Sequence, residues 1–195
     1  MNVRIKQIID QIKLLEDELS EELHQQEDHL LFQLKGKKVE FEQSIKQAHR
    51  KFKTNVWQWL FGLHPINLVT APIIYSMIVP LVISDLFVSF YQATCFPVYK
   101  ISKVRRSDFI VIDRHQLAYL NIFEKLHCVY CAYANGLNAY IQEILAKTEQ
   151  YFCPIKHAHK VLGTHSRYRK YMAYGDAENY HDKLEILRNE LAKEK

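Results

Sequence analysis

The chain has 195 residues, of which only 5 are Gly and 5 are Pro, a composition typical of a largely helical protein with a real hydrophobic core. The formal net charge of +4 is small, so the distribution of charge along the chain carries more information than the sum. The 4 cysteines and a charged, amphipathic N-terminus, unlike a signal peptide, predict free thiols in a reducing compartment, and nothing in the pattern suggests export.

Residues 1–34 predict a long helix with the heptad spacing of a coiled coil. Apolar residues recur at alternating intervals of three and four. They are Ile5, Ile8, Ile12, Leu15 and Leu19. The phase then slips by four residues toward Leu23, Leu30 and Leu34, as in a stutter, and the basic run at 35–38 is predicted to interrupt the helix. Two interpretations stay open: a coiled coil with a protein partner or a second copy of the chain, and an amphipathic helix packed on the rest of the protein.

Residues 38–60 predict a second amphipathic helix, with a basic face and with tryptophans at its end. A basic face opposite an apolar one is typical of a helix on an anionic membrane surface, and tryptophan prefers the lipid–water interface. The alternative is a helix packed on the protein core. The residues predicted to lie at the membrane surface are Lys46, Arg50, Lys51, Lys53, Trp57 and Trp59.

Residues 63–99 form an apolar segment with a single formal charge, Asp85. The segment exceeds the roughly 20 residues that a helix needs to cross a bilayer, which predicts that it is embedded in a membrane. Two topologies are possible. One is a single kinked span over about residues 68–91, and the other is a hairpin that reverses near Pro80 to Asp85 and returns to the side it entered.

Basic residues flank the apolar segment on both sides, at 35–53 and at 100–106. Cationic flanks mark the cytoplasmic side of a membrane, so both ends are predicted to be cytoplasmic. This favours a re-entrant or monotopic hairpin over the single span. The bulk of the chain is predicted to lie on the cytoplasmic side.

The segment from 116 to 152 contains one glycine and no proline, which predicts a long helix. Four ligand-type residues lie on one face of it: Glu124, His127, Cys128 and Cys131. Carboxylate, imidazole and thiolate groups bind metals, so this face predicts a metal site, with zinc favoured and iron as the alternative. A structural explanation stays open, because buried cysteines often act as small hydrophobic residues.

Cys153 and His157, further along the chain, extend this pattern to that of a four-ligand CCCH zinc site. On an unbroken helix, however, Cys128 and Cys153 would lie about 37 Å apart. They can share one metal only if the helix breaks near Asn135 and Gly136.

Glu178 and His181 form a Glu-x-x-His pair, as do Glu124 and His127. If the chain reverses after Pro154 and returns as a helix, the second pair is predicted to lie level with Cys128. Such pairs on two helices are typical of di-iron bundles. His115 is a further candidate ligand or proton carrier, although its neighbourhood also fits a helix N-cap.

Basic and aromatic residues alternate between Lys156 and Lys170, which favours contact with lipid headgroups. No motif of a nucleic-acid-binding fold accompanies them, and no specific nucleic acid is expected. The chain closes with a predicted amphipathic helix over 176–195.

Three phrases resemble an uncharacterised family of bacterial membrane proteins of about this length. They are HPINLVTAPIIYS at 64–76, EKLHCVYCAYANGL at 124–137 and EQYFCPIKHA at 149–158. The resemblance implies a bacterial inner-membrane setting and no particular activity.

These patterns predict an all-α protein with three regions: amphipathic helices in 1–60, a membrane-embedded segment in 63–99 and a cytoplasmic helical domain in 107–195. The predicted function is that of a membrane-anchored, metal-binding structural or regulatory protein. The alternatives are a membrane-associated metalloenzyme and a thiol redox or metal-handling protein that uses the CxxC pair. No residue pattern identifies a reaction.

Overall fold

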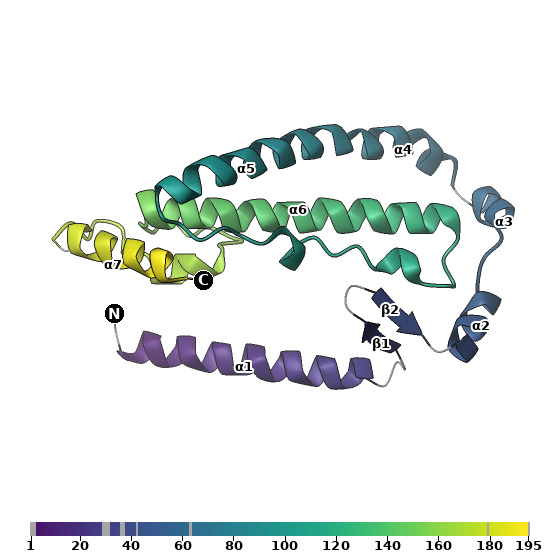
Figure 1. Ribbon diagram of the computed structural model, residues 1–195, viewed down its shortest axis with the longest axis horizontal. Helices are drawn as coiled ribbons and strands as arrows, with labels where there is room; N and C mark the ends of the chain where they lie inside the picture. The colour runs from purple at the N-terminus through teal and green to yellow at the C-terminus, as the bar shows by residue number, and fades with distance from the viewer. Residues whose placement is uncertain are drawn as a thin grey trace. The chain divides into compact units, whose positions relative to one another are not determined.

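The computed structural model describes residues 3–28, 32–35, 38–41, 43–62, 64–178 and 180–194. The chain is mostly helical, as predicted, with one two-stranded sheet added. In chain order the elements are α1 Val3–Asp28, β1 Phe32–Lys35, β2 Lys38–Phe41, α2 Gln43–Lys51, α3 Val56–Phe61, α4 Pro65–Ser76, α5 Ile78–Val98, η1 Arg106–Asp108, η2 Arg114–Gln116, α6 Ile122–Phe152, η3 Ser166–Lys170 and α7 Tyr180–Lys193 (Figure 1).

Two compact units make up the structure. The first consists of Met1–Thr54 and Gln116–Asn121, and the second consists of Asn55–His115 and Ile122–Lys195. The predicted membrane segment and most of the predicted C-terminal helical domain therefore belong to the same unit.

A β-hairpin in the first unit takes the place of the adjoining ends of the two helices predicted over 1–34 and 38–60. Phe32 pairs with Phe41, and Lys35 pairs with Lys38. Apolar and polar residues alternate in both strands, which is the period of two expected for a strand. The heptad pattern therefore ends at α1, and Leu34 belongs to a strand; Leu30 lies outside the described residues.

The single helix predicted over 38–60 is wrong, because the structure divides this stretch into β2, α2 and α3. The side chain of Asn55 caps α3 by accepting a hydrogen bond from the backbone N–H of Trp57 at 3.4 Å. Such a cap satisfies a backbone donor that a new helix leaves free, so α3 starts here instead of continuing α2.

α4 and α5 together form one long apolar helix in the second unit. They cover Pro65–Val98, 34 residues with a mean hydropathy of 2.0, which is long and apolar enough to cross a membrane by length and composition alone. The only irregularity lies at Met77, because Pro80 lacks an N–H for the carbonyl of Ser76 and its ring crowds that group. The helix continues through Pro80–Asp85, so the structure does not show the hairpin that the flanking charges favoured (Figure 1).

The chain then turns back along this helix. We call residues 99–115 the return segment; apart from the short turns η1 and η2, it has no regular structure. α6 follows and runs in the same direction as α4 and α5, since contacting residue numbers rise together along the two helices (Figure 1). The pairs that show this are Tyr75 with Tyr130, whose ring centroids are 5.3 Å apart, Tyr91 with Thr148, whose hydroxyls are 2.9 Å apart, and Tyr99 with Tyr151, whose ring centroids are 5.1 Å apart.

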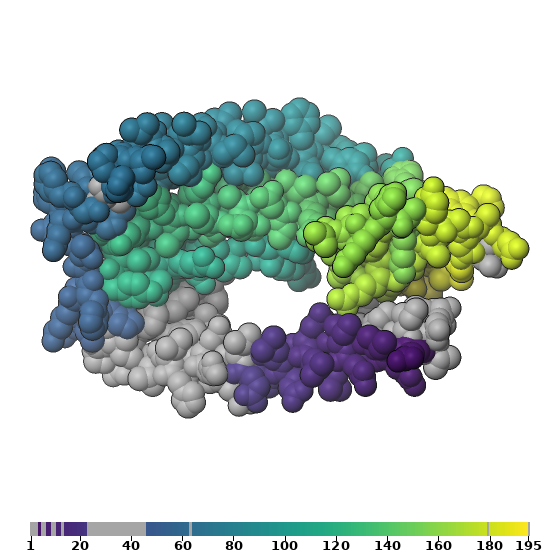
Figure 2. All heavy atoms as spheres, turned by 180° about the vertical axis from the view of Figure 1, so that it is seen from behind, coloured from purple at the N-terminus to yellow at the C-terminus, as the bar shows by residue number. Residues whose placement is uncertain are grey.

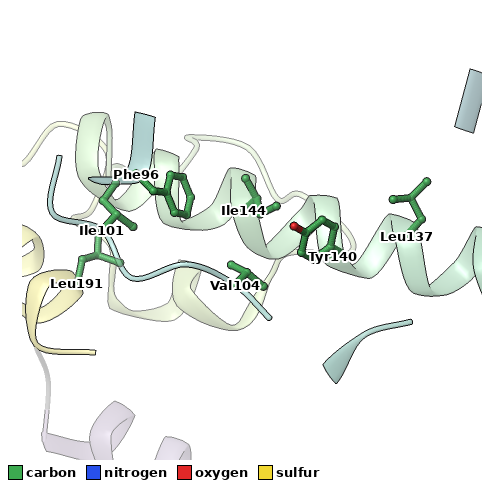
Figure 3. Packing of buried hydrophobic residues seen from close by; sticks show 7 residues of the cluster. All are labelled: Phe96, Ile101, Val104, Leu137, Tyr140, Ile144 and Leu191. Carbon is green, nitrogen blue, oxygen red and sulfur yellow. The ribbon is translucent and has the colours of Figure 1, made fainter. Parts of the chain in front are cut away.

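The hydrophobic core of the second unit lies between α5, the return segment, α6 and α7. Phe96 from α5 is fully buried between Ile101 of the return segment and Ile144 of α6, and Leu191 from α7 closes the cluster beside Ile101 (Figure 3). Val104, Leu137 and Tyr140 complete it. The return segment is thus part of the core and not a loose connection.

Gly136 explains how the return segment comes so close to α6. A Cβ atom at this position would lie 2.6 Å from the carbonyl oxygen of Phe109 and 2.9 Å from the Cα of Ile110. Only glycine leaves room for a backbone at that distance. The predicted long helix is therefore confirmed: α6 does not break at Asn135–Gly136, as a shared CCCH metal site would require, and the glycine serves packing.

Candidate functional site

Asp85, the only formal charge of the apolar segment, lies at the centre of a polar cluster between α5, the return segment and α6. Arg106 donates hydrogen bonds to both carboxylate oxygens, one of them at 2.6 Å from Nη2 to Oδ2. The hydroxyl of Tyr133 donates to Oδ2 at 2.8 Å, and that of Ser89 donates to Oδ1 at 3.3 Å. The buried carboxylate is therefore fully paired, which is the condition for keeping a charge in an apolar helix.

Gln92, two helical turns further along α5, holds the return segment by its backbone. Its side-chain oxygen accepts a hydrogen bond from the Val104 N–H at 2.7 Å, and its amide nitrogen donates to the Val104 carbonyl at 3.3 Å. The same nitrogen donates to the hydroxyl of Tyr140 on α6 at 2.8 Å. One side chain thus provides hydrogen-bond partners for both backbone groups of Val104, which have no partner in a sheet or helix.

Lys147 fastens the beginning of the return segment to the C-terminal half of α6. Its ammonium group donates to the carbonyl of Ser102 at 3.1 Å and to the hydroxyl of Ser102 at 2.6 Å, and it lies 3.2 Å from a carboxylate oxygen of Glu194. Together, the groups of Asp85, Gln92 and Lys147 form a polar seam along the first half of the return segment, from Ser102 to Arg106. Each hydrogen-bonds to protein groups, so the seam fixes the fold and offers no free acid, base or nucleophile.

A second polar cluster joins α6, η3 and the C-terminus around Arg167. Its guanidinium donates to Glu143 at 2.6 and 2.9 Å, to Glu194 at 2.7 and 2.8 Å, and to Gln150 at 3.0 Å. Burial alone would lower the pKa of Arg167, but the hydrogen bonds to Glu194 and Glu143 outweigh it and raise the pKa above its ordinary value. The hydrogen bond from Arg167 lowers the pKa of Glu194.

The lowered pKa of Glu194 predicts an acid-dependent loss of stability. A carboxyl group whose pKa is lower in the folded state stabilises the fold above its unfolded value of 4.5, and this contribution disappears as the pH falls through the folded value. We expect Glu194→Gln to flatten the dependence of the melting temperature on pH between about pH 5 and about pH 3. The control is Glu190→Gln, which removes an exposed carboxylate 3.2 Å from Lys170 and should leave the slope unchanged. Equal slopes in all three proteins would contradict the prediction.

The ligand-type residues predicted on α6 lie near α4 and α3 but do not form a metal cage. The ring of His127 stacks on Tyr75 at 5.6 Å with an interplanar angle of 6° and lies 6.0 Å from the ring of Trp59. Glu124 and Cys128 are half-buried, and Cys131 is exposed. Within the described residues, no group of three or more His, Cys, Asp or Glu side chains is arranged to hold a metal ion. The neighbouring helices α4 and α3 place the rings of Tyr75 and Trp59 beside His127, where a metal site would need further ligands.

Cys153 and His157 lie at the other end of α6. Because the helix is unbroken over 31 residues, Cys153 is about 37 Å from Cys128, and the CCCH pattern cannot converge on one metal within a chain. Both residues are exposed. The backbone N–H of His157 donates to the hydroxyl of Tyr168 at 2.6 Å, and the His157 ring stacks on that tyrosine at 6.2 Å.

α7 does not bring Glu178 and His181 level with Cys128. It packs on the last turns of α6, where Gln150 donates to the carbonyl of Leu187 and Arg188 donates to the carbonyl of Tyr151, each at 3.0 Å. Since α7 runs antiparallel to α6, its first turn lies beyond the end of that helix. The predicted register is wrong because the connection after Pro154 consumes about 25 residues before α7 starts.

The remaining predicted residues are spread over both units. His115 is exposed in η2, and Arg50, Lys51 and Lys53 are exposed in the first unit, where Lys46 is half-buried. In the second unit, Trp57 is 65% exposed and stacks on Phe61 at 6.3 Å, whereas Trp59 is half-buried and stacks on Phe123.

The Asp85 cluster was not among the predicted sites, although the sequence contains a signal for it. A lone carboxylate in a long apolar segment needs a cationic partner, and Arg105 and Arg106 follow in the next charged stretch. Neither a family model, nor a curated protein, nor a solved structure matches this chain. The resemblance to bacterial membrane proteins therefore stays a prediction.

Proposed function

We propose that this protein is a membrane-anchored structural protein whose α4–α5 helix lies in the plane of the membrane surface. The observation that carries the proposal is a long, exposed and mostly apolar stripe along that helix, in which Ser76 and Thr94 are the polar residues. We call it the apolar face. It consists of Leu68, Val69, Ile73, Val79, Ile83, Leu86, Phe87, Phe90 and Val98, which are 49–74% exposed.

The apolar face points away from α6, because the opposite side of the same helix holds Asp85, Gln92 and Phe96 in the core. In Figure 2, α4 and α5 form a continuous outer surface of the second unit. Soluble monomeric proteins rarely leave so large a continuous apolar patch in water. A lipid bilayer is the solvent that suits this composition and length.

The exposed hydroxyls of this helix are also suited to lipid. Thr70 donates to the carbonyl of Ile66 at 2.9 Å, Ser76 donates to that of Ile73 at 2.7 Å, and Thr94 donates to that of Phe90 at 2.9 Å. Each hydroxyl is thus satisfied inside its own helix, and none of these three needs water as an acceptor.

The return segment favours an in-plane helix over one that spans the bilayer. Arg106 bonds to Asp85 near the middle of the 34-residue helix, and Arg105, Ser107 and Asp108 beside it are exposed. If the helix spanned the bilayer, the charged side chains of Arg105 and Asp108 would lie at the depth of the hydrocarbon core, at a cost of about 2.5–3.5 kcal/mol each. An in-plane helix keeps them in water while the apolar face enters the lipid.

Vesicle flotation of the full-length protein tests the proposal. Replacing Phe87 and Phe90 together by Asp is expected to lower the partition coefficient by at least about 100-fold, since each buried Phe contributes about 1.5–3 kcal/mol. Leu162→Asp is the matched control, because Leu162 is 84% exposed in the connection between α6 and α7 and outside the apolar face. If the double variant floats as well as the wild type, or if the wild type stays soluble and monodisperse without lipid, the proposal fails.

An in-plane helix also predicts the sidedness of the chain. Reporter fusions after Lys53 and after Lys103 should both report the cytoplasm, because the anionic cytoplasmic leaflet attracts the basic flanks and neither end crosses the membrane. A periplasmic signal from one of the two would support the single span instead.

The metal, enzyme and thiol functions predicted from the sequence are not part of this proposal. The described ligand residues are distributed over α6, η2, the first turn of α7 and the connection between α6 and α7, and their geometry favours no particular reaction.

A further inference from the structure

α1 carries a second exposed apolar surface, which has a different shape from the apolar face. The helix has 26 residues and is about 39 Å long. Its exposed apolar side chains at positions of the heptad repeat are Ile8, Ile12, Leu15 and Leu19, with exposed fractions of 47%, 36%, 61% and 60%. We call these four residues the α1 seam.

The α1 seam is narrow, with about one apolar residue per turn at intervals of four, three and four. A helix that packs on a globular core needs a wider apolar stripe, whereas two residues per heptad are typical of the contact between two coiled helices. The seam therefore fits one other helix of similar length.

Charge is distributed very unevenly along α1. Residues 3–15 contain three basic residues and one acidic residue, a net charge of +2. Residues 16–28 contain seven acidic residues and no Lys or Arg, a net charge of −7. A partner helix must place positive charge beside the second half of α1 and must tolerate positive charge beside the first half.

We propose that α1 pairs with α1 of a second copy of this chain in an antiparallel, two-stranded coiled coil. The antiparallel arrangement sets the basic half of each helix beside the acidic half of the other. A parallel pair would place two segments of net charge −7 side by side, which is unfavourable at coiled-coil distances. This proposal is independent of the membrane anchor, because it uses a different surface of the protein.

Sedimentation equilibrium of the full-length protein in a nonionic detergent tests the dimer. The wild type is expected to be a dimer, and Ile12→Asp together with Leu15→Asp should raise the dimer Kd by at least about 100-fold. Leu14→Asp is the matched control: Leu14 is 67% exposed and adjacent to Leu15, but it lies outside the α1 seam. A wild-type monomer, or equal effects of Leu14→Asp and the seam variant, would overturn the proposal. The Phe87→Asp/Phe90→Asp variant should remain a dimer, which separates this contact from the apolar face.

A charge-reversal variant tests the orientation. Changing Asp17, Glu18 and Glu21 to Lys brings the net charge of residues 16–28 from −7 to −1. In the antiparallel dimer this change removes attraction, so the dimer Kd should rise by about 10-fold or more at low salt, and added salt should weaken the wild-type dimer. In a parallel dimer the same change relieves repulsion, so a lower Kd for the variant would overturn the antiparallel arrangement.

Discussion

Replacing Asp85 by Ala is expected to lower the free energy of unfolding by about 2–5 kcal/mol. The Asp85 side chain is 11% exposed, and its loss leaves the donors of Arg106, Tyr133 and Ser89 without their acceptor. A buried hydrogen-bond donor without an acceptor lowers the stability of the fold, and a guanidinium without its carboxylate lowers it most. Because the Arg106 side chain is 45% exposed and water can reach it, the lower half of this range is expected. Denaturant unfolding in nonionic detergent, followed by circular dichroism, measures the change.

Two further variants separate the ion pair from a general effect of the substitution. Asp108→Ala removes an exposed carboxylate two residues after Arg106, and it should change the free energy of unfolding by less than about 0.5 kcal/mol. Replacing Asp85 and Arg106 together by Leu should recover most of the loss, since a matched apolar pair leaves no buried charge unpaired. Equal losses for Asp85→Ala and Asp108→Ala would show that the cluster does not stabilise the fold.

Gly136→Ala is expected to destabilise the protein by about 1–3 kcal/mol, with a larger loss for Gly136→Val. Helix propensity alone predicts the opposite sign, because Ala in a helix interior is favoured over Gly by about 1 kcal/mol. The added Cβ would lie 2.6 Å from the Phe109 carbonyl oxygen, a backbone atom that cannot rotate away as a side chain can. The return segment would have to move, and its bonds to Gln92 would weaken.

Asn135→Ala is the matched control for this substitution. Asn135 is the exposed neighbour of Gly136 on the same helix, and its side chain only donates to the Cys131 carbonyl at 2.9 Å. Its replacement should be neutral within about 0.5 kcal/mol. If Gly136→Ala stabilised the protein as much as propensity predicts, the close passage of the return segment over α6 would be wrong.

The main helices could be predicted because their signals are local. The apolar segment over 63–99 appears as α4 and α5, and the proline-free stretch after 116 appears as α6. The β-hairpin at 32–41 could also have been predicted, since apolar and polar residues alternate in its sequence with a period of two. It was missed because the heptad pattern that precedes it is longer and was extended through it.

The candidate metal site was predicted from residues that share a helix face, and a shared face does not bring side chains to one point. Glu124, His127 and Cys128 are close in sequence, but a metal needs ligands from more than one direction. The structure places the rings of Tyr75 and Trp59 beside His127. Nothing in the sequence of α6 specifies which residues of another element will lie opposite it.

The sequence by itself determined the long helices and the apolar character of α4–α5, because propensity and hydropathy act over a few neighbouring residues. Only the tertiary structure decided the path between them. The return segment has no periodic pattern, and its position depends on bonds across 12 to 45 residues, from Gln92 to Val104, from Asp85 to Arg106 and from Ser102 to Lys147. It also depends on a single glycine, whose missing Cβ admits a backbone that local sequence does not reveal. This path carries charged residues to the middle of the apolar helix, and that position is the physical basis of our proposal that the helix lies along a membrane instead of across it.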